Sequence, residues 1–168
     1  GTYTFAGEEI TQKKMQSSRF SKEFHRRIGF VFQNPDVQLF CNNVRDEIAF
    51  GPVQMGLGPE ETDRRVNDVM EMIDITGLAD RAPYHLSGGE KKRVAIASVL
   101  TMNPEVLTLD EPLAGLDRRT QAWLLEFLEQ MQNIGKTIIV STHDDALAHL
   151  IGDNIIYMND DHRIDYIL

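Results

Sequence analysis

Residues 86–117 constrain the fold of this chain more than any other stretch of its sequence. The stretch begins with the letters LSGGE, in which Ser87 is followed three residues later by Glu90. That spacing is typical of a capping box, which predicts a helix beginning at residue 88. Gly88 and Gly89 are unfavourable in a first helical turn unless another group must approach the backbone closely. Since a helix N-terminus attracts anions, these residues indicate a phosphate site rather than an ordinary capped helix.

The same stretch ends with two adjacent carboxylates, Asp110 and Glu111, which follow the apolar run 106–109. The run predicts a buried strand with both carboxylates at its tip. Such a pair is costly unless a cation or hydrogen-bond donors meet it. One carboxylate can hold a metal ion while the other acts on a water molecule. A phosphate site and a metal–water pair together indicate nucleotide hydrolysis.

Polar residues also follow other predicted strands. The apolar segments 28–32, 106–109, 137–141 and 155–158 predict a mostly parallel α/β sheet with helices between most of the strands. Gln33 and His143 stand at the ends of two of these segments. Open α/β sheets bind ligands at the carboxyl ends of their strands, so Gln33, Asp110, Glu111 and His143 are candidate site residues. Alternatively, Gln33 only caps the end of its strand.

The remaining segments fill in the architecture. Residues 2–5 predict a short strand with a turn at Gly7, and 8–24 a loop or a short helix. The block 36–103 is helical in pattern, interrupted at Gly51-Pro52, with Gly77 as a helix C′ residue. Asp117 is placed to N-cap a helix over 118–133 that Gly135 ends. After the last strand, 163–168 is expected to pair back on 155–158.

Composition excludes several classes of protein. The 168 residues are 42% hydrophobic and 26% charged, and no apolar run approaches the roughly 20 residues needed to span a bilayer. A formal charge of −9 argues against a nucleic-acid surface, and the basic cluster 91–93 is expected to be a solvated helix face. A single cysteine, Cys41, cannot form an intrachain disulfide, which favours a reducing compartment.

These motifs, in this order, resemble the nucleotide-binding domain of ATP-binding-cassette (ABC) proteins over essentially the whole chain. LSGGE resembles the signature motif, residues 106–112 the Walker B motif, and residues 114–117 the D-loop. Residues 31–57 are closer still to the ATPases of energy-coupling-factor importers, which take up cobalt, nickel and vitamins. The resemblance implies a P-loop NTPase-like (RecA-like) core over 1–33 and 104–168, with an inserted helical signature subdomain over 34–103.

The resemblance also assigns roles to the candidate residues. It implies ATP and Mg²⁺ as cofactors, with Asp110 and Gln33 as metal ligands. Glu111 is expected to polarise the attacking water and His143 to contact the γ-phosphate, with Gln33 completing the catalytic set. The nucleotide-contacting residues of the signature motif are expected to serve ATP held by a second ATPase subunit, and Asp117 to act across the same dimer interface. These signature residues are Ser87, Gly88, Gly89 and Glu90.

Partners and location follow from the same resemblance. Residues 34–40 are expected to meet an integral membrane transport component, which places the subunit at the cytoplasmic face of the cell membrane as a peripheral protein. No nucleic acid is expected among the partners. A chromosome-maintenance or DNA-repair ATPase would share the signature motif, but such proteins insert long coiled coils, and no sustained heptads occur in this sequence.

One motif of the family is absent from these residues, the phosphate loop G-x-x-x-x-G-K-[ST] (Walker A). Gly135-Lys136-Thr137 matches only its tail and leads into a strand rather than a helix. We expect the phosphate loop, with its strand and helix, to lie upstream of Gly1, so that these 168 residues are a domain truncated at its N-terminus. The 168 residues alone are then expected to hydrolyse essentially no ATP. The alternative is a degenerate subunit that lends its signature motif to a partner's ATP site.

Overall fold

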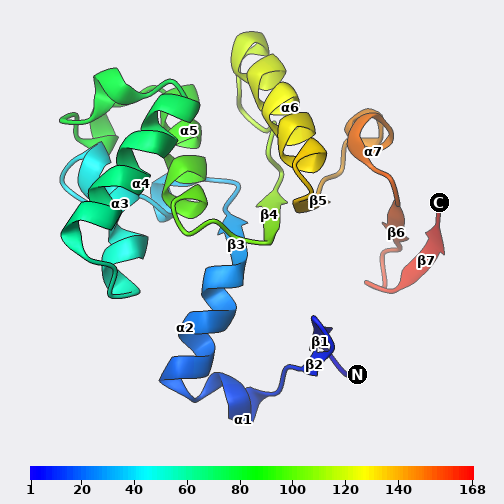
Figure 1. The fold of residues 1–168 in the computed structure, drawn as a ribbon. Helices are drawn as coiled ribbons and strands as arrows, with labels where there is room; N and C mark the ends of the chain where they lie inside the picture. Colours follow the sequence, from blue (N-terminus) through cyan, green and yellow to red (C-terminus); the bar gives the residue numbers. More distant parts are fainter.

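A three-stranded parallel sheet lies at the centre of the computed structural model, which describes residues 1–168 (Figure 1). Its strands, in spatial order, are β3 (Ile28–Val31), β4 (Val106–Asp110) and β5 (Thr137–Ser141). Val31 lies opposite Leu109, and Asp110 lies opposite Ser141. The carboxyl ends of all three strands therefore meet at one edge of the sheet. The α/β class with a parallel sheet is confirmed.

The two faces of this sheet differ in burial. Leu107 and Leu109 of β4 are buried with Val31 of β3, and the helices α5 (Gly88–Leu100) and α6 (Arg118–Asn133) contribute to the same core. On the opposite face, Phe30 and Ile139 are 43% and 52% exposed. Alternate residues of a strand point to opposite faces, so the helices cover one face of the sheet and leave these side chains open.

A helical segment packs beside the sheet (Figure 1, cyan to green). It consists of α3 (Val44–Gln54), α4 (Pro59–Met72) and α5, with short 3-10 turns at Pro35–Val37, Thr76–Leu78 and Pro83–His85. On α4, the apolar side chains of Val66, Val69 and Met70 are buried. These side chains belong to the same 19-residue core as the sheet, so the helical segment and the strands share one hydrophobic interior.

The predicted break at Gly51-Pro52 is wrong, because α3 continues through both residues to Gln54. Proline has no N–H group, so within a helix it leaves the carbonyl four residues earlier without its partner. That carbonyl belongs to Ile48, and the hydroxyl of buried Thr101 lies 3.1 Å from it. A side chain from the neighbouring helix thus replaces the missing donor.

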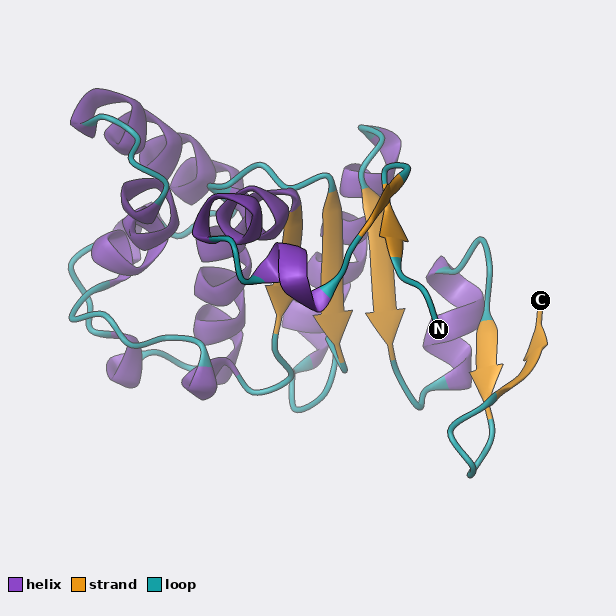
Figure 2. Ribbon diagram, turned by 90° about the horizontal axis from the view of Figure 1, so that it is seen from below, coloured by secondary structure: helices purple, strands orange, loops and turns teal.

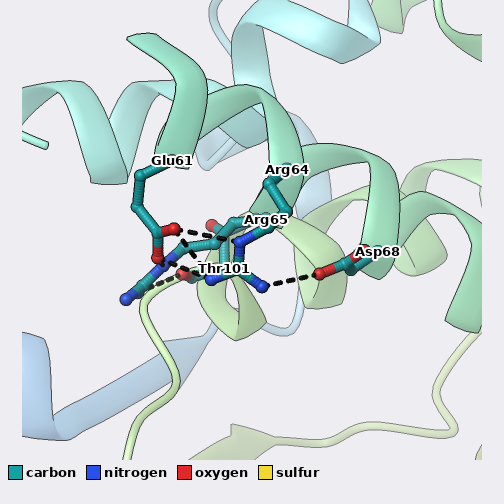
Figure 3. A network of polar contacts seen from close by, with 5 residues as sticks. All are labelled: Glu61, Arg64, Arg65, Asp68 and Thr101. Atoms are coloured by element: carbon teal, nitrogen blue, oxygen red, sulfur yellow. Dashed lines mark hydrogen bonds and ion pairs between the residues drawn. The ribbon is translucent and has the colours of Figure 1, made fainter. Parts of the chain in front are cut away.

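The helices α4 and α5 are also joined by polar contacts (Figure 3). Glu61 accepts from Arg64 and Arg65, and Arg65 donates to the Thr101 carbonyl at 3.2 Å.

The predicted C′ role of Gly77 is wrong. Ile73 caps α4, and Asp74 follows with φ = 56°, so an aspartate adopts the left-handed conformation instead.

The N-terminal region is more regular than a loop. The predicted turn at Gly7 joins the two-residue strands β1 (Thr4–Phe5) and β2 (Glu8–Glu9). The predicted loop or short helix over 8–24 is instead two helices, α1 (Gln12–Met15) and α2 (Ser18–Arg27). Ser17 caps α2 through its side chain, and Phe24 of α2 lies edge-to-face with Phe5 of β1.

At the other end of the chain, the expectation that 155–158 belongs to the main sheet is wrong. After α7 (Asp145–Ile151), which was not predicted, β6 (Ile156–Met158) pairs antiparallel with β7 (Ile164–Ile167), as was predicted for 163–168. Tyr157 and Tyr166 stack across this pair. The hairpin stands apart from the parallel sheet in Figure 2, and its two strands pair only with each other.

Candidate functional site

The tips of β4 and β5 bring together three of the predicted site residues. Asp110 ends β4, and one of its carboxylate oxygens accepts a hydrogen bond of 2.6 Å from the Ser141 hydroxyl at the end of β5. The Glu111 N–H donates to the Ser141 carbonyl at 2.9 Å. Glu111 has φ = 39°, in the left-handed region that residues other than glycine rarely adopt. The chain thus turns sharply just where the carboxylate is presented.

Glu111 is held from β5 by the residues that follow that strand. Its Oε1 accepts from the His143 backbone N–H at 2.8 Å and lies 2.6 Å from His143 Nδ1. Its Oε2 accepts from the Thr142 hydroxyl at 3.2 Å. The hydrogen bond to Glu111, followed by the charge of that carboxylate, raises the pKa of His143 above its ordinary value. Glu111 is mostly shielded while the His143 ring is 87% exposed, so the imidazole is free to meet a ligand.

Gln33 lies at the same edge of the sheet, two residues beyond β3. Its side chain is exposed and lines a cavity of about 380 Å³ together with Gly88 at the start of α5 and Gly115. Its backbone carbonyl accepts from the ammonium of Lys92 at 3.0 Å. The structure therefore places the Gln33 side chain beside the start of α5, without a hydrogen bond to Asp110 or Glu111.

The predicted capping box at the start of α5 is present. Ser87 Oγ accepts from the Glu90 N–H at 3.3 Å, and Glu90 Oε2 accepts from the Ser87 N–H at 2.7 Å. The hydrogen bond from the Ser87 backbone is the main cause that lowers the pKa of Glu90. Both side chains are occupied within the cap, so the remaining free backbone donors of the helix start are those that a ligand would use.

The two glycines of this turn have different surroundings. A side chain at Gly88 would meet nothing within 4 Å, whereas a Cβ at Gly89 would lie 2.6 Å from Thr120 Oγ1. Gly88 is therefore open to an approaching group. Gly89 lets α5 and α6 start side by side.

Asp117 caps α6 as predicted. Its Oδ1 accepts from the Arg119 and Thr120 N–H groups at 2.9 and 3.0 Å, and its Oδ2 accepts from the Thr120 hydroxyl at 2.9 Å. The backbone and hydroxyl hydrogen bonds from Thr120 lower the pKa of Asp117. Asp117, Ser87 and Glu90 line a second cavity of about 440 Å³ between the two helix starts.

The carboxylates at the end of β4 suit a hard cation that keeps part of its water shell, rather than a metal ion surrounded by protein ligands. The structure contains no group of three or more His, Cys, Asp or Glu side chains that could hold a metal ion. Mg²⁺ commonly keeps several waters and uses one or two carboxylates, one of which Asp110, half-buried at the end of β4, can supply.

Sequence reasoning missed a buried cation in this region. The expectation that 91–93 is a solvated face is wrong, because Lys92 is 1% exposed and the side chains of Lys91 and Arg93 are each 18% exposed. Burial lowers the pKa of Lys92, and the charge of Asp110 opposes this effect. The available signal was periodicity: Ala95 and Ile96, three and four residues later, lie on the same buried face.

Comparison with known proteins gives consistent matches. The sequence model of the ABC transporter family matches residues 1–114. A putative ABC transporter ATP-binding protein of Clostridium acetobutylicum is 49% identical over 164 residues, which cover 98% of this chain and 68% of that protein. The nickel import ATP-binding protein LarO of Lactiplantibacillus plantarum is 47% identical over 165 residues, with 98% and 68% of the two chains covered.

Solved structures show the same fold. CbiO1 of Clostridium perfringens, part of the ABC transporter complex CbiONQ, has a TM-score of 0.83 and 38% identity over 98% of this chain and 64% of its own. A dimeric bacterial ABC transporter cassette has a TM-score of 0.83 and 26% identity, over 100% of this chain and 72% of that one. The chain thus spans about two thirds of the length of these proteins.

Proposed function

The chain belongs to the ABC transporter family, and from this premise we propose that it is the ATP-binding and ATP-hydrolysing subunit of an importer of the energy-coupling-factor type. Cobalt, nickel or a vitamin is the proposed cargo of that importer. The similarity to a nickel import protein and to a component of CbiONQ supports this class of transporter.

The observation that supports hydrolysis is the Glu111 carboxylate, which hydrogen bonds hold in place just after the end of β4. Its two oxygens are oriented by the His143 and Thr142 groups, and Asp110 lies beside it. A carboxylate held in this way can accept a proton from a water that attacks the γ-phosphate. His143, with its exposed ring and raised pKa, is suited to contact that phosphate as a cation.

Mg²⁺ is the proposed cofactor beside ATP, with Asp110 and Gln33 as its protein contacts. When bound, the metal would supply charge neutralisation at the phosphates. The role of the protein is positional: the Ser141 hydroxyl orients Asp110, and Lys92 fixes the backbone of Gln33.

A second ATPase subunit is the proposed partner at the signature motif. Ser87, Gly88, Gly89 and Glu90 would face the nucleotide of that subunit, and Asp117 would lie at the same interface. Open space at Gly88 and the adjoining cavities support this arrangement. A similar cassette is dimeric in its solved structure.

The proposed contact with the membrane component is the segment 34–40. Val37 and Phe40 of this segment are 68% and 65% exposed, and Phe40 lies edge-to-face with Phe50 of α3. The buried Glu47 carboxylate accepts from the Phe40 and Cys41 N–H groups, so the loop is held while its apolar side chains face outward. None of the helices is both long and apolar enough to cross a bilayer. We propose a peripheral location at the cytoplasmic face of the membrane.

A second candidate function, favoured by the open space at the start of α5, uses only the signature helix, which is α5. In that case the chain lends its signature helix to the ATP site of a partner, and Glu111 does no chemistry. The 168 residues alone are proposed to bind ATP weakly and to hydrolyse essentially none.

A mixing experiment distinguishes the two functions. CbiO1 of Clostridium perfringens, with its own signature serine replaced by arginine, is combined with this chain, and phosphate release is measured. If the chain lends its signature helix to CbiO1, the mixture should release phosphate in a way that needs Ser87 and is unaffected by Glu111→Gln. Hydrolysis in the chain's own site would face the altered serine and predicts no turnover in this mixture. With a CbiO1 that keeps its signature serine but has its own catalytic glutamate replaced by glutamine, it predicts turnover that is lost with Glu111→Gln in this chain. Strong turnover by the chain alone, abolished by Glu111→Gln, would contradict the proposed inactivity of the 168 residues.

A further inference from the structure

The ammonium group of Lys92 is buried inside the structure and donates to two backbone carbonyls. Lys92 lies in the second turn of α5 and is 1% exposed. Its Nζ lies 3.1 Å from the Phe32 carbonyl oxygen and 3.0 Å from that of Gln33. A buried charge is costly unless several hydrogen bonds compensate it, so the position of this ammonium is tied to these two carbonyls.

Two further contacts bind the same loop to the same helix. Lys91 Nζ pairs with Asp36 at 2.6 Å. The Gln38 side chain donates to the Ala95 carbonyl at 2.9 Å and accepts from the Phe32 N–H at 3.2 Å. We call the contacts of Lys91, Lys92 and Gln38 the α5 clasp. The clasp fastens residues 32–38 to α5 between Lys91 and Ala95, which is little more than one helical turn.

The clasp connects two parts of the proposed machinery. The start of α5 carries Ser87 and Gly88, and the fastened loop carries Gln33 and leads to the exposed Val37 and Phe40. Gly88, Lys91 and Lys92 line one cavity with Gln33 and Asp36, so the helix start and the loop form two walls of the same space.

We propose that Lys92 is a positioning residue that makes the signature helix and the Gln33 loop move as one body. A displacement of the helix start on meeting a partner's nucleotide would then displace Gln33 and the segment 34–40 with it. The proposal rests on the proposed function for its consequence, since the helix start must meet ATP for the movement to matter. The mechanical link itself rests on the contacts of the α5 clasp, with the buried Lys92 at its centre, and does not require ATP.

Amide hydrogen exchange of the free chain tests the link without ATP. Lys92→Met keeps the length and the buried stem but removes all donors. We expect exchange in 33–38 to become at least about tenfold faster, because hydrogen bonds from a charged donor are lost there. Exchange at the β4 amides 107–109 should change much less. A purely structural role would speed exchange throughout the chain, and this result, or no change in 33–38, would overturn the proposal.

Lys136→Met is the matched control. Lys136 also donates to a backbone carbonyl, that of Pro104 at 2.8 Å, but it lies away from the clasp. We expect amide exchange near 103–105 to become faster in this variant and exchange in 33–38 to keep its rate. If Lys92→Met does not fold, Lys92→Gln, which retains a shorter donor, must still speed exchange in 33–38 selectively. Absence of that selective change overturns the proposal.

The second arm adds ATP to the mixture of this chain with the altered CbiO1. In the unmodified chain, ATP should slow exchange both at 88–91 and at 33–38. In Lys92→Met it should slow exchange at 88–91 only, and equal slowing of both segments would overturn the proposal. If ATP slows neither segment in the unmodified chain, the proposed function fails, while the ATP-free comparison still decides the role of Lys92.

Discussion

The imidazole Nδ1 of His143 lies 2.6 Å from Oε1 of Glu111, which joins the ends of β5 and β4 through two side chains 32 residues apart. The backbone N–H of His143 donates to the same oxygen, so the contact does not depend on the imidazole alone. The parallel register of the two strands, with Asp110 opposite Ser141, creates this meeting.

This contact predicts the titration of His143. Because Glu111 raises its pKa, His143 should titrate above the ordinary value of 6.5. Glu111→Gln should return the pKa of His143 toward that value. The stabilisation from this pair is therefore fully present below pH 6.5 and is lost as the pH rises through the raised pKa. NMR titration of the imidazole Cε1–H resonances measures the shift.

Assignment of the resonance needs the His143→Gln variant, in which one imidazole signal must disappear. The Glu111→Gln change leaves the backbone N–H of His143 in place, so the fold around the turn should persist. A pKa of His143 that is the same with and without the Glu111 carboxylate would contradict the contact.

Gly88 and Gly89 offer a matched pair of substitutions in one helical turn. Gly89→Ala places a methyl group against Thr120 Oγ1, which is already bonded to Asp117, and we expect a loss of about 1–3 kcal/mol in unfolding free energy. Gly88→Ala meets open space and should be neutral or stabilising by up to about 1 kcal/mol. Urea unfolding measures both. Equal effects would show that α5 and α6 do not start side by side.

The capping box gives a prediction that depends on pH. Ser87→Ala should cost about 1 kcal/mol of stability near neutral pH, because the Glu90 N–H loses its acceptor. The pKa of Glu90 is lowered from 4.5, so its share of the stabilisation is present above pH 4.5 and is lost as the pH falls through the lowered pKa. Unfolding midpoints of the Glu90→Gln variant should therefore approach those of the unmodified chain in acid. A constant difference at every pH would contradict this role.

Local patterns predicted the features that depend on neighbouring residues. The caps at Ser87 and Asp117, the helix end at Gly135 and the parallel strands all follow from residues within a few positions of one another. The hydrogen bonds at a helix end join residues only a few positions apart, so a short stretch of sequence is enough to predict the cap. The sequence predicted only that Glu111 and His143 lie at the same edge of the sheet. Their direct contact could not be predicted, because the distance between the two side chains depends on the register of β4 and β5.

Two of the wrong expectations, those at Lys92 and Pro52, share a different cause, which is compensation from distant residues. Lys92 lies on a buried face because the Phe32 and Gln33 carbonyls, about 60 positions away, accept hydrogen bonds from its ammonium group. Pro52 stays within α3 because Thr101 replaces the missing donor. No pattern within a short window contains these partners.

The contact of Thr101 with the Ile48 carbonyl supplies a prediction for α3. The Thr101 hydroxyl is shared between this carbonyl and that of Ser98, which lies 3.0 Å away. Thr101→Val removes the hydroxyl at nearly constant volume and should cost about 1–3 kcal/mol, because a buried acceptor loses its donor. Thr101→Ser keeps the hydroxyl, so it should recover most of this loss in urea unfolding.

A double-mutant cycle shows whether Pro52 is the reason that Thr101 matters. Pro52→Ala restores an N–H group that can donate to the Ile48 carbonyl within the helix. In the Pro52→Ala background, Thr101→Val should therefore cost about 1 kcal/mol less than it does in the unmodified chain, since only the Ser98 carbonyl then loses a partner. Urea unfolding of the four variants measures this coupling. Equal costs in the two backgrounds would mean that α3 satisfies Ile48 in another way.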